Sequence, residues 1–220
     1  PLHTLDKFRA RPHAWPKLWK HQAAQEASDI TSTISQERDG GQWMHERYGG
    51  RISAEWMHPK ALHMFDEDRE LFDATDVFVD AGDWFVFTLV NGAIGDAEGA
   101  RTLKDPEFLR SACQAGFKGC WAGPELGFPS CNTLNRVRAG FGDGMEHKFH
   151  NIGTIVPPGT PISPGLSRSA AQRLGLCQGT PVGVSIIDAH AGVPGVSVGE
   201  ANTLVCVMGT SGCYMLNIKD

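Results

Sequence analysis

Apolar and small or polar positions alternate along residues 180–187, where Val182, Val184 and Ile186 define one face. This period of two predicts a strand that ends at Asp188. A second apolar run over residues 204–208 leads into a glycine turn at 209–212, and a third run follows at 213–216. The pattern therefore predicts a strand, an aspartate, a loop, and then two strands joined by a glycine turn.

Candidate chemistry lies at the ends of these predicted strands. Ligands of open α/β sheets bind beyond the carboxyl ends of the strands, which makes Asp188 a candidate catalytic acid. Gly209, Thr210 and Ser211 combine backbone N–H groups with hydroxyls, a composition that suits a phosphate cradle. About twenty residues separate the two features, so neighbouring strands can present both to one cleft.

Helical periodicity dominates the earlier part of the chain. One face is shared by five apolar residues of a first helix, which is expected to end near residues 39–41: Ala23, Ala24, Ala27, Ile30 and Ile34. Ser53 is expected to cap a second helix that turns Trp56, Leu62 and Phe65 toward the core. A third helix is predicted over residues 80–90, with Trp84, Phe85 and Leu89 inward and Asn91–Gly92 as its stop signal.

Two less regular stretches contain further candidates. Leu18 and Trp19 suggest a short buried strand, and residues 19–21 join an aromatic platform to hydrogen-bonding groups, which suits a sugar. A buried Trp19 beside solvated charges is an equally good interpretation. Residues 107–135 are expected to be irregular, and there Lys118 either extends to solvent or points into a cleft to hold a polar ligand. His147 and His150 are expected on the surface.

Composition restricts the classes of protein. The chain has 220 residues, 41% of them apolar, and a net charge of -5, which is typical of a globular protein and excludes a strongly basic nucleic-acid surface. No apolar run reaches the length of about 18 residues needed for a membrane span. The six cysteines contain no Cys-x-x-Cys pair, so reduced thiols in a cytoplasmic protein are expected. The first residue is not Met, and we expect the chain to be a piece of a longer protein.

Five motifs together resemble the FGGY carbohydrate kinases, and among them the ribulokinase branch. They are residues 17–25 (KLWKHQAAQ), 48–56 (YGGRISAEW), 115–118 (AGFK), 188–190 (DAH) and 208–211 (MGTS). The resemblance implies an α/β, actin-like or ribonuclease H-like fold. It implies that residues 1–197 form the later part of a sugar-binding domain and that residues 198–220 begin an ATP-binding domain. The family's first phosphate motif, Asp-x-Gly-Thr, does not occur in this chain.

The resemblance also implies an activity and roles for single residues. The reaction would be ATP-dependent, Mg²⁺-assisted phosphorylation of a ketopentose, L-ribulose, with Asp188 as general base. Lys118, Trp19, Lys20 and His21 would contact the sugar. Gly209, Thr210 and Ser211 would contact the ATP phosphates. A homodimer is compatible with the resemblance, whereas nucleic-acid and membrane partners are not expected, and this piece alone is expected to be inactive.

Several alternatives remain open at this point. Many FGGY kinases have Gly three residues before the catalytic acid, where this chain has Ser185, and residues 186–192 also resemble the D-ribulokinase branch. D-ribulose or another pentulose is therefore an alternative substrate. A metal hydrolase that uses Asp188 and His190 as ligands is a second alternative. A non-catalytic sugar-binding fragment is a third.

Overall fold

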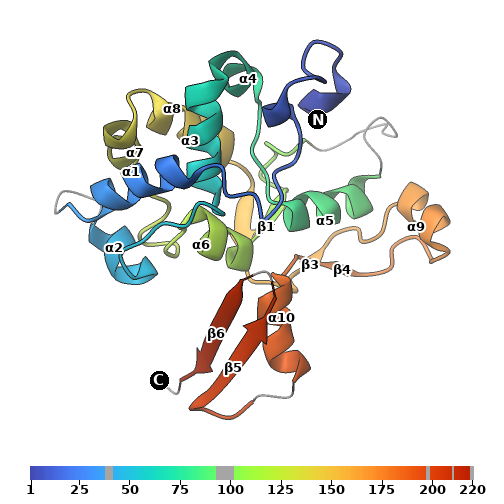
Figure 1. The fold of residues 1–220 in the computed structure, drawn as a ribbon. Helices are drawn as coiled ribbons and strands as arrows, with labels where there is room; N and C mark the ends of the chain where they lie inside the picture. The colour runs from blue at the N-terminus through green and yellow to red at the C-terminus, as the bar shows by residue number, and fades with distance from the viewer. Residues whose placement is uncertain (38–41, 93–101, 197–198, 210, 219–220) are drawn as a thin grey trace.

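The computed structural model describes residues 1–37, 42–92, 102–196, 199–209 and 211–218 (Figure 1). These residues form helices and three small two-stranded sheets, an architecture compatible with the predicted α/β class. The first two thirds of the chain build a mainly helical body, and the last two strands extend from it with α10 at their side (Figure 1).

The α-helices of the described residues are short. They are α1 (Gln25–Ser35), α2 (Gln42–Tyr48), α3 (Met57–Glu67), α4 (Arg69–Ala74), α5 (Ala81–Asn91), α6 (Ala112–Gly119), α7 (Cys131–Val137), α8 (Phe141–Met145), α9 (Arg168–Leu174) and α10 (Asp188–Gly195). Two 3₁₀ turns, η1 (Leu2–Thr4) and η2 (Pro12–Ala14), precede them, and a π-helical turn, η3 (Glu146–His150), follows α8.

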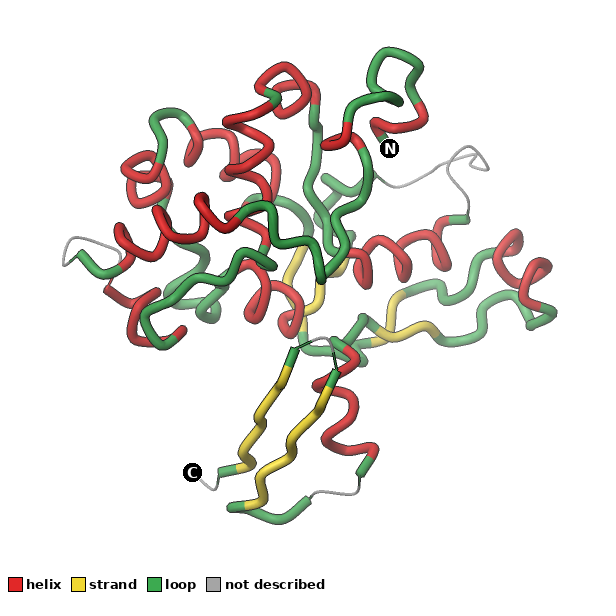
Figure 2. Tube along the Cα trace, viewed as in Figure 1, coloured by secondary structure: helices red, strands yellow, loops and turns green. Residues whose placement is uncertain are grey.

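Each of the three sheets pairs two strands (Figure 2). The parallel pair is β1 (Leu109–Ser111) with β2 (Thr154–Val156). A short antiparallel pair joins β3 (Pro161–Ile162) to β4 (Val182–Gly183). The longest ladder is the hairpin of β5 (Thr203–Met208) and β6 (Gly212–Asn217), in which Met208 pairs with Gly212 next to the turn.

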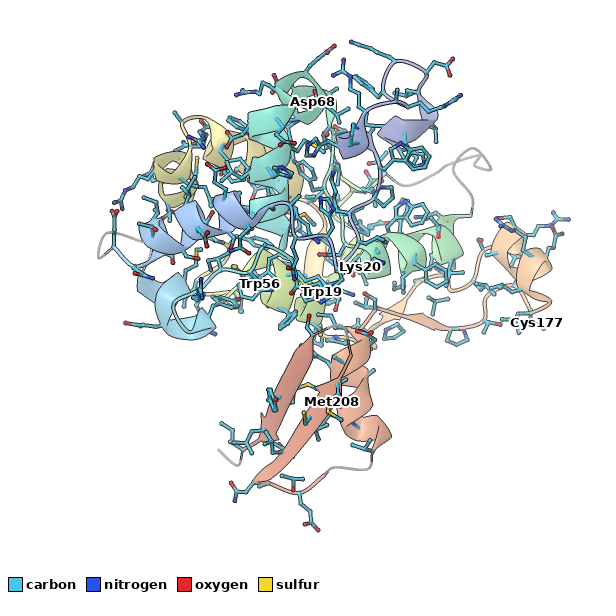
Figure 3. All side chains as sticks on the ribbon, viewed as in Figure 1. Trp19, Lys20, Trp56, Asp68, Cys177 and Met208 are labelled. Atoms are coloured by element: carbon cyan, nitrogen blue, oxygen red, sulfur yellow. The ribbon has the colours of Figure 1, made fainter. Side chains whose placement is uncertain are left out.

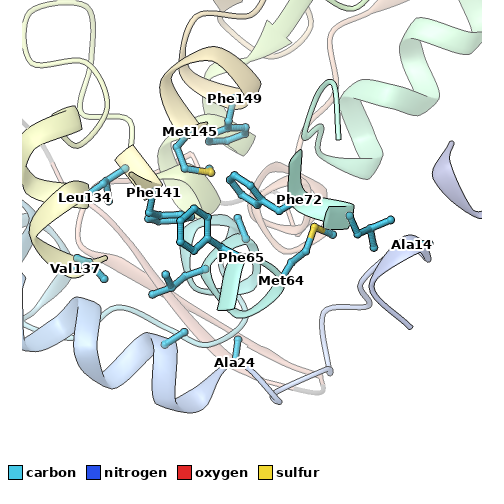
Figure 4. Packing of buried hydrophobic residues seen from close by; sticks show 14 of the residues in the cluster. Ala14, Ala24, Met64, Phe65, Phe72, Leu134, Val137, Phe141, Met145 and Phe149 are labelled. Carbon is cyan, nitrogen blue, oxygen red and sulfur yellow. The ribbon is translucent and has the colours of Figure 1, made fainter. Parts of the chain in front are cut away.

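The main core lies where α1, α3, α4, α7 and α8 meet. Phe65, Phe72 and Phe141 converge there (Figure 4), and the rings of Phe65 and Phe72 meet edge to face with centroids 4.9 Å apart. Aromatic pairs of this geometry add to the stabilisation from burial alone. This core fixes α3, and with it the segment that precedes α3 along the chain.

The local sequence signals of the hairpin and of the end of α5 are confirmed. The two predicted apolar runs form β5 and β6, joined at the predicted glycine turn. Gly92 ends α5 with a positive φ of 84°, which glycine adopts without a steric cost. In the first helix Ala24 and Ala27 are buried, as expected, while Ala23 is exposed.

The predicted strand before Asp188 is wrong in length, and Asp188 does not precede a loop. Only Val182 and Gly183 form ladder pairs, because the partner strand β3 has just two residues. Asp188 begins helix α10, and its Oδ1 accepts a hydrogen bond from the N–H of Ala189 at 2.8 Å. No strand forms at Leu18 either, because its side chain is 62% exposed and lacks a neighbouring strand among the described residues.

Helix α5 turns a different face inward than the apolar pattern predicts. Phe85 is 58% exposed, whereas Asp83 is buried. Asp83 points inward because its Oδ1 accepts hydrogen bonds from the Ser111 N–H at 3.0 Å and the Ser185 hydroxyl at 2.9 Å. Two specific polar partners therefore decide the orientation of α5 against the preference of its aromatic residues.

Residues 107–135 are more regular than predicted, since they contain β1, α6 and the start of α7. Ser111 and Ser130 cap these helices by accepting hydrogen bonds from Gln114 N–H and Thr133 N–H. Ser53 does not cap α3, which begins after Trp56.

His150 was expected on the surface but packs inside, with its Nε2 2.9 Å from Nε2 of His58. Burial lowers the pKa of His58 to about 3, so this ring is neutral.

Three further expectations concern the domain boundary, the cysteines and membrane-spanning helices. The expected domain boundary between residues 197 and 198 lies outside the described residues. All six cysteines are free thiols, as expected. Among the described helices, none has the length and apolar character required to cross a membrane.

Candidate functional site

The turn of the β5–β6 hairpin meets the helical body through a short chain of polar contacts. The indole Nε1 of Trp19 donates to the hydroxyl of Ser211 at 3.1 Å, and that hydroxyl donates to Oε1 of Glu55 at 3.2 Å. Figure 3 shows Trp19 and Lys20 at the base of the helical body, next to the end of the hairpin where its turn lies. A predicted sugar-side residue and a predicted phosphate-side residue are therefore in direct contact.

Lys118 lies on the same side of the body, near the end of α6. Its Nζ is 5.8 Å from the centre of the Trp19 ring, and the neighbouring Phe117 stacks on Trp19 with centroids 5.9 Å apart. Trp56 adds an edge-on contact to Phe117 at 6.0 Å. A cation beside aromatic faces can bind a polyol, because the rings pack against its C–H groups and the ammonium donates to its hydroxyls.

Asp188 stands at the first position of α10 with an exposed side chain. Two residues later, His190 places its Nδ1 2.8 Å from Sγ of Cys113 on α6, and its ring meets Phe117 edge to face. Burial raises the pKa of the Cys113 thiol. Burial also lowers the pKa of His190, although the nearby Asp188 opposes this shift. The pair is therefore a neutral thiol and imidazole that joins α10, which carries Asp188, to α6, which carries Lys118.

A buried polar layer supports α6 and the segment before Asp188. Asp80, Asp83 and Arg110 are all less than 7% exposed, and Lys118 acts electrostatically on both aspartates. Burial is the main cause that raises the pKa of Asp80, to about 6, with a smaller contribution from Asp83. Asp80 Oδ2 and Arg110 Nη2 are buried without a hydrogen-bond partner in the described part of the chain. Such atoms are costly unless a partner satisfies them.

The other predicted site residues are placed less decisively. Lys20 has an exposed side chain, and Gly209 is exposed at the hairpin turn, where its N–H donates to the Ser211 carbonyl at 3.3 Å. His21 is half-buried and lies near Lys17 and Lys60. Lys60 also interacts electrostatically with Lys118. Thr210 lies outside the described residues. The structure thus brings Trp19, Lys118 and Ser211 close together. The functional roles predicted for these and for the other site residues stay predictions.

Sequence reasoning missed Glu55, Phe117, Asp80 and Asp83. Glu55 and Phe117 lie inside two of the recognised motifs, directly before Trp56 and Lys118. Their positions in these motifs could have identified them as site residues. Glu55 also borders a polar depression of about 310 Å³, together with Gln22, Gln25 and Arg51. The buried aspartates had no such signal, because a helix pattern assigns acids to the solvent side.

The alternative of a metal hydrolase receives no support from the geometry. Within the part of the chain that the structure describes, Asp188 and His190 do not belong to any group of three potential metal ligands. Nδ1 of His190 is instead engaged by Cys113. A hydrolytic metal site needs about three protein ligands, so this alternative is set aside.

Comparison with known proteins places these motifs in a larger context. No family model matches the chain. The ribulokinase of Anoxybacillus flavithermus is 37% identical over 216 residues, which cover 98% of this chain and 35% of that protein. The ribulokinase of Geobacillus thermodenitrificans is 38% identical with the same coverage. That of Shouchella clausii is 36% identical over 220 residues, covering 100% of this chain and 36% of the relative.

The matches extend over nearly the whole chain, including every motif on which the resemblance rests. The chain spans only about a third of the length of these curated relatives, 35% or 36%. Their shared name indicates a carbohydrate kinase, that is, a phosphotransferase. The resemblance drawn from the motifs is thus confirmed: along its length, this chain is similar to about a third of proteins named ribulokinase.

Proposed function

We propose that the protein containing this chain transfers a phosphoryl group from ATP to a ketopentose, with L-ribulose as its preferred substrate. The observation that carries the proposal is the contact of Trp19 with both Lys118 and Ser211, because it joins the predicted sugar side to the predicted phosphate side. The ribulokinases that match the chain support the same reaction class. The finer fold assignment, an actin-like kinase divided at residues 197 and 198, belongs to this proposal.

Phosphoryl transfer requires alignment and charge stabilisation more than covalent help from the protein. In the proposed step, the Asp188 carboxylate accepts the proton of the sugar's primary hydroxyl. The hydroxyl oxygen then bonds to the γ-phosphorus of ATP, and the bond from phosphorus to the bridging oxygen breaks, releasing ADP. Asp188 suits this role because its carboxylate is exposed at the start of α10, adjacent to the element that carries Lys118.

The other residues of the site bind and orient. Lys118 donates to sugar hydroxyls, with Trp19 and Phe117 packing against the carbon skeleton, while Lys20 and His21 form the edge of the sugar site. Gly209, Thr210 and Ser211 bind phosphate oxygens through N–H and hydroxyl groups. Bound with the nucleotide, Mg²⁺ would neutralise phosphate charge.

The substrate is tested by ADP release from the full-length protein with L-ribulose, D-ribulose, xylulose and glycerol. We expect the highest kcat/KM with L-ribulose. Preference for D-ribulose would support the D-ribulokinase alternative, which rests on the resemblance of residues 186–192 to that branch. ADP release that no sugar stimulates would exclude the proposal and favour a non-catalytic sugar-binding protein.

The role of Asp188 is tested by Asp188→Asn, which retains the size of the side chain but removes the proton acceptor. General-base assistance contributes about 10²–10⁴-fold, and kcat should fall by that factor while sugar binding persists. Asp29→Asn is a matched control, because Asp29 is an exposed acid on α1 whose carboxylate accepts a hydrogen bond from the Gln25 side chain. Near-normal kcat in Asp188→Asn would remove this residue from the chemical step.

A further inference from the structure

Outside the proposed kinase site, two histidines and a glutamate meet between α3 and the N-terminal segment. His63 and Glu67 are four residues apart on α3, which places both on one face of the helix. His13 comes from η2, fifty residues earlier in the chain, and is buried against them. The sequence suggested no relation among these residues, and the proposed reaction uses none of them.

The donor atoms of the three residues lie close to one another. Nε2 of His13 is 2.8 Å from Oε2 of Glu67, Nε2 of His63 is 3.1 Å from Oε1, and ligand atoms of the three residues all lie within 4.8 Å of one another. Neighbouring ligands held about 2.0–2.2 Å from a metal are separated by roughly 2.8–3.6 Å in octahedral or tetrahedral geometry. We propose that His13, His63 and Glu67 form a binding site for a divalent transition-metal ion of the zinc class.

The donor set selects the class of metal. Two imidazoles with one carboxylate suit Zn²⁺, Co²⁺ or Ni²⁺, whereas Mg²⁺ and Ca²⁺ prefer sites made of oxygen ligands. The His13 side chain is only 7% exposed and that of His63 is 18% exposed, whereas that of Glu67 is 58% exposed. The site is thus walled by protein on the imidazole side and open to solvent at the carboxylate, where water can complete the coordination.

A competing cation lies beside the cluster. Lys17 is close enough to Glu67 to interact electrostatically, and its Nζ is 3.4 Å from the Pro12 carbonyl next to His13. His21 also lies near His13 and His63. A bound divalent ion must displace or tolerate the positive charge of Lys17, so removal of that charge should strengthen metal binding.

Metal binding here would connect two separate parts of the chain. His63 and Glu67 belong to α3, which also supplies Leu62 and Phe65 to the main core. His13 belongs to a segment with little regular structure, residues 5–24. His13 Nδ1 is buried and has no hydrogen-bond partner among the described residues, so the contacts of Nε2 are the ones that orient this ring. A metal would therefore anchor the N-terminal segment to α3 and raise the melting temperature.

The test uses the full-length protein, treated with a chelator and then titrated with Zn²⁺ in a calorimeter and with Co²⁺ in a spectrophotometer. His63→Gln and Glu67→Gln are the informative variants, because both side chains are partly exposed and their replacement leaves the core intact. His147→Gln and Glu125→Gln are matched controls, since both are exposed side chains elsewhere on the surface. Lys17→Met tests the competing charge.

The parent and both controls should bind Zn²⁺ at this site with equal affinity, and Co²⁺ should give a visible spectrum of nitrogen and oxygen ligation. Loss of even an outer partner of a metal ligand weakens binding by about 10–100-fold. Loss of the ligand itself, in His63→Gln or Glu67→Gln, should weaken it at least that much and abolish the Co²⁺ spectrum. Lys17→Met should bind more tightly. Equal affinity and an unchanged spectrum in the parent, His63→Gln and Glu67→Gln would overturn the proposal.

Discussion

The helical body and the β5–β6 hairpin use apolar residues in contrasting ways. In the body, Phe72 is 1% exposed and Leu62 is fully buried within a cluster drawn from five helices. In the hairpin, exposure alternates along β5 and along the first part of β6, and Met208 is 88% exposed and Tyr214 is 71% exposed. The hairpin's shape therefore rests on its backbone ladder and turn, whereas the body's shape rests on side-chain packing.

This difference separates the two halves of the proposed active site. Trp19 and Lys118, on the sugar side, are backed by packed aromatic residues of the body. Ser211, on the phosphate side, joins the body through two hydrogen bonds of its hydroxyl. Polar contacts of this kind contribute about 0.5–1.5 kcal/mol each, less than the burial of one large apolar side chain. Changes in the body should therefore affect stability, and changes in the hairpin should affect mainly the link between the halves.

The largest effect is expected from Phe72→Ala. Phe72 contacts the rings of Phe65 and Phe141 in the main core, and deletion of a buried phenyl group leaves a cavity. Such substitutions cost roughly 3–5 kcal/mol. Chemical unfolding of the parent and variant chains measures the loss. A loss below about 1 kcal/mol would show that the body is as loosely packed as the hairpin, which contradicts the comparison.

Burial of charge also distinguishes the body from the hairpin, and it predicts a pH dependence through Asp80. Its pKa rises from 3.8 to about 6 on folding, mainly through burial. Between these values the folded state binds more protons than the unfolded state, so the contribution of Asp80 to stability falls as pH rises from about 4 to 6. Because one pKa unit corresponds to about 1.36 kcal/mol, the free energy of unfolding should fall by about 3 kcal/mol.

Asp80→Asn should remove this part of the pH dependence, because the amide does not titrate. The free energy of unfolding is measured at pH 5 and pH 8 for both proteins, and the variant should lose less stability over this interval. Asp29→Asn serves as the control, since Asp29 is exposed. An identical pH dependence of the parent and Asp80→Asn would show that Asp80 is ionised throughout.

The features that sequence predicted are those determined by neighbouring residues. The hairpin follows from alternation and a glycine turn, and Gly92 ends α5 because glycine adopts a positive φ without a steric cost. The site motifs were found for a similar reason, since each is a contiguous string. The contact of Trp19 with Ser211 joins residues 192 positions apart in the chain, and the sequence did not predict it: the family resemblance only assigned the two residues to the sugar and to the ATP phosphates.

The features that sequence missed depend on partners distant along the chain. Asp83 turns inward because Ser111 and Ser185 donate hydrogen bonds to it. The sequence of α5 itself does not indicate either partner. The cluster of His13, His63 and Glu67 has the same origin, since η2 approaches α3 only in the folded chain. Helical periodicity assigns polar residues to solvent by default, and it is wrong where tertiary contacts satisfy them.

A smaller effect is expected at the link between hairpin and body. Ser211→Ala and Glu55→Gln each disturb the hydrogen bond from Ser211 to Glu55, and a double-mutant cycle isolates their coupling. A coupling of about 0.5–1.5 kcal/mol is expected from one hydrogen bond, more if the carboxylate strengthens it. Ser53 also donates to Glu55 and is the matched control, so Ser53→Ala should leave the Ser211 coupling unchanged. Zero coupling would show that the hairpin is not held by this contact.

The smallest effect is expected from Met208→Ser at the end of β5. With 88% of its surface exposed, Met208 gains almost no burial from folding of the chain, and its backbone pairing with Gly212 does not depend on the side chain. Surface substitutions of this kind change stability by about 0.5 kcal/mol or less. Val207 is the matched comparison, because its side chain lies on the other face of the strand, toward Gly192 of α10. Val207→Ser should therefore lower the free energy of unfolding more than Met208→Ser. An equal or larger loss at Met208, measured by chemical unfolding of the same chain, would mean that the exposed face of β5 is packed in solution, and the contrast between the body and the hairpin would then fail.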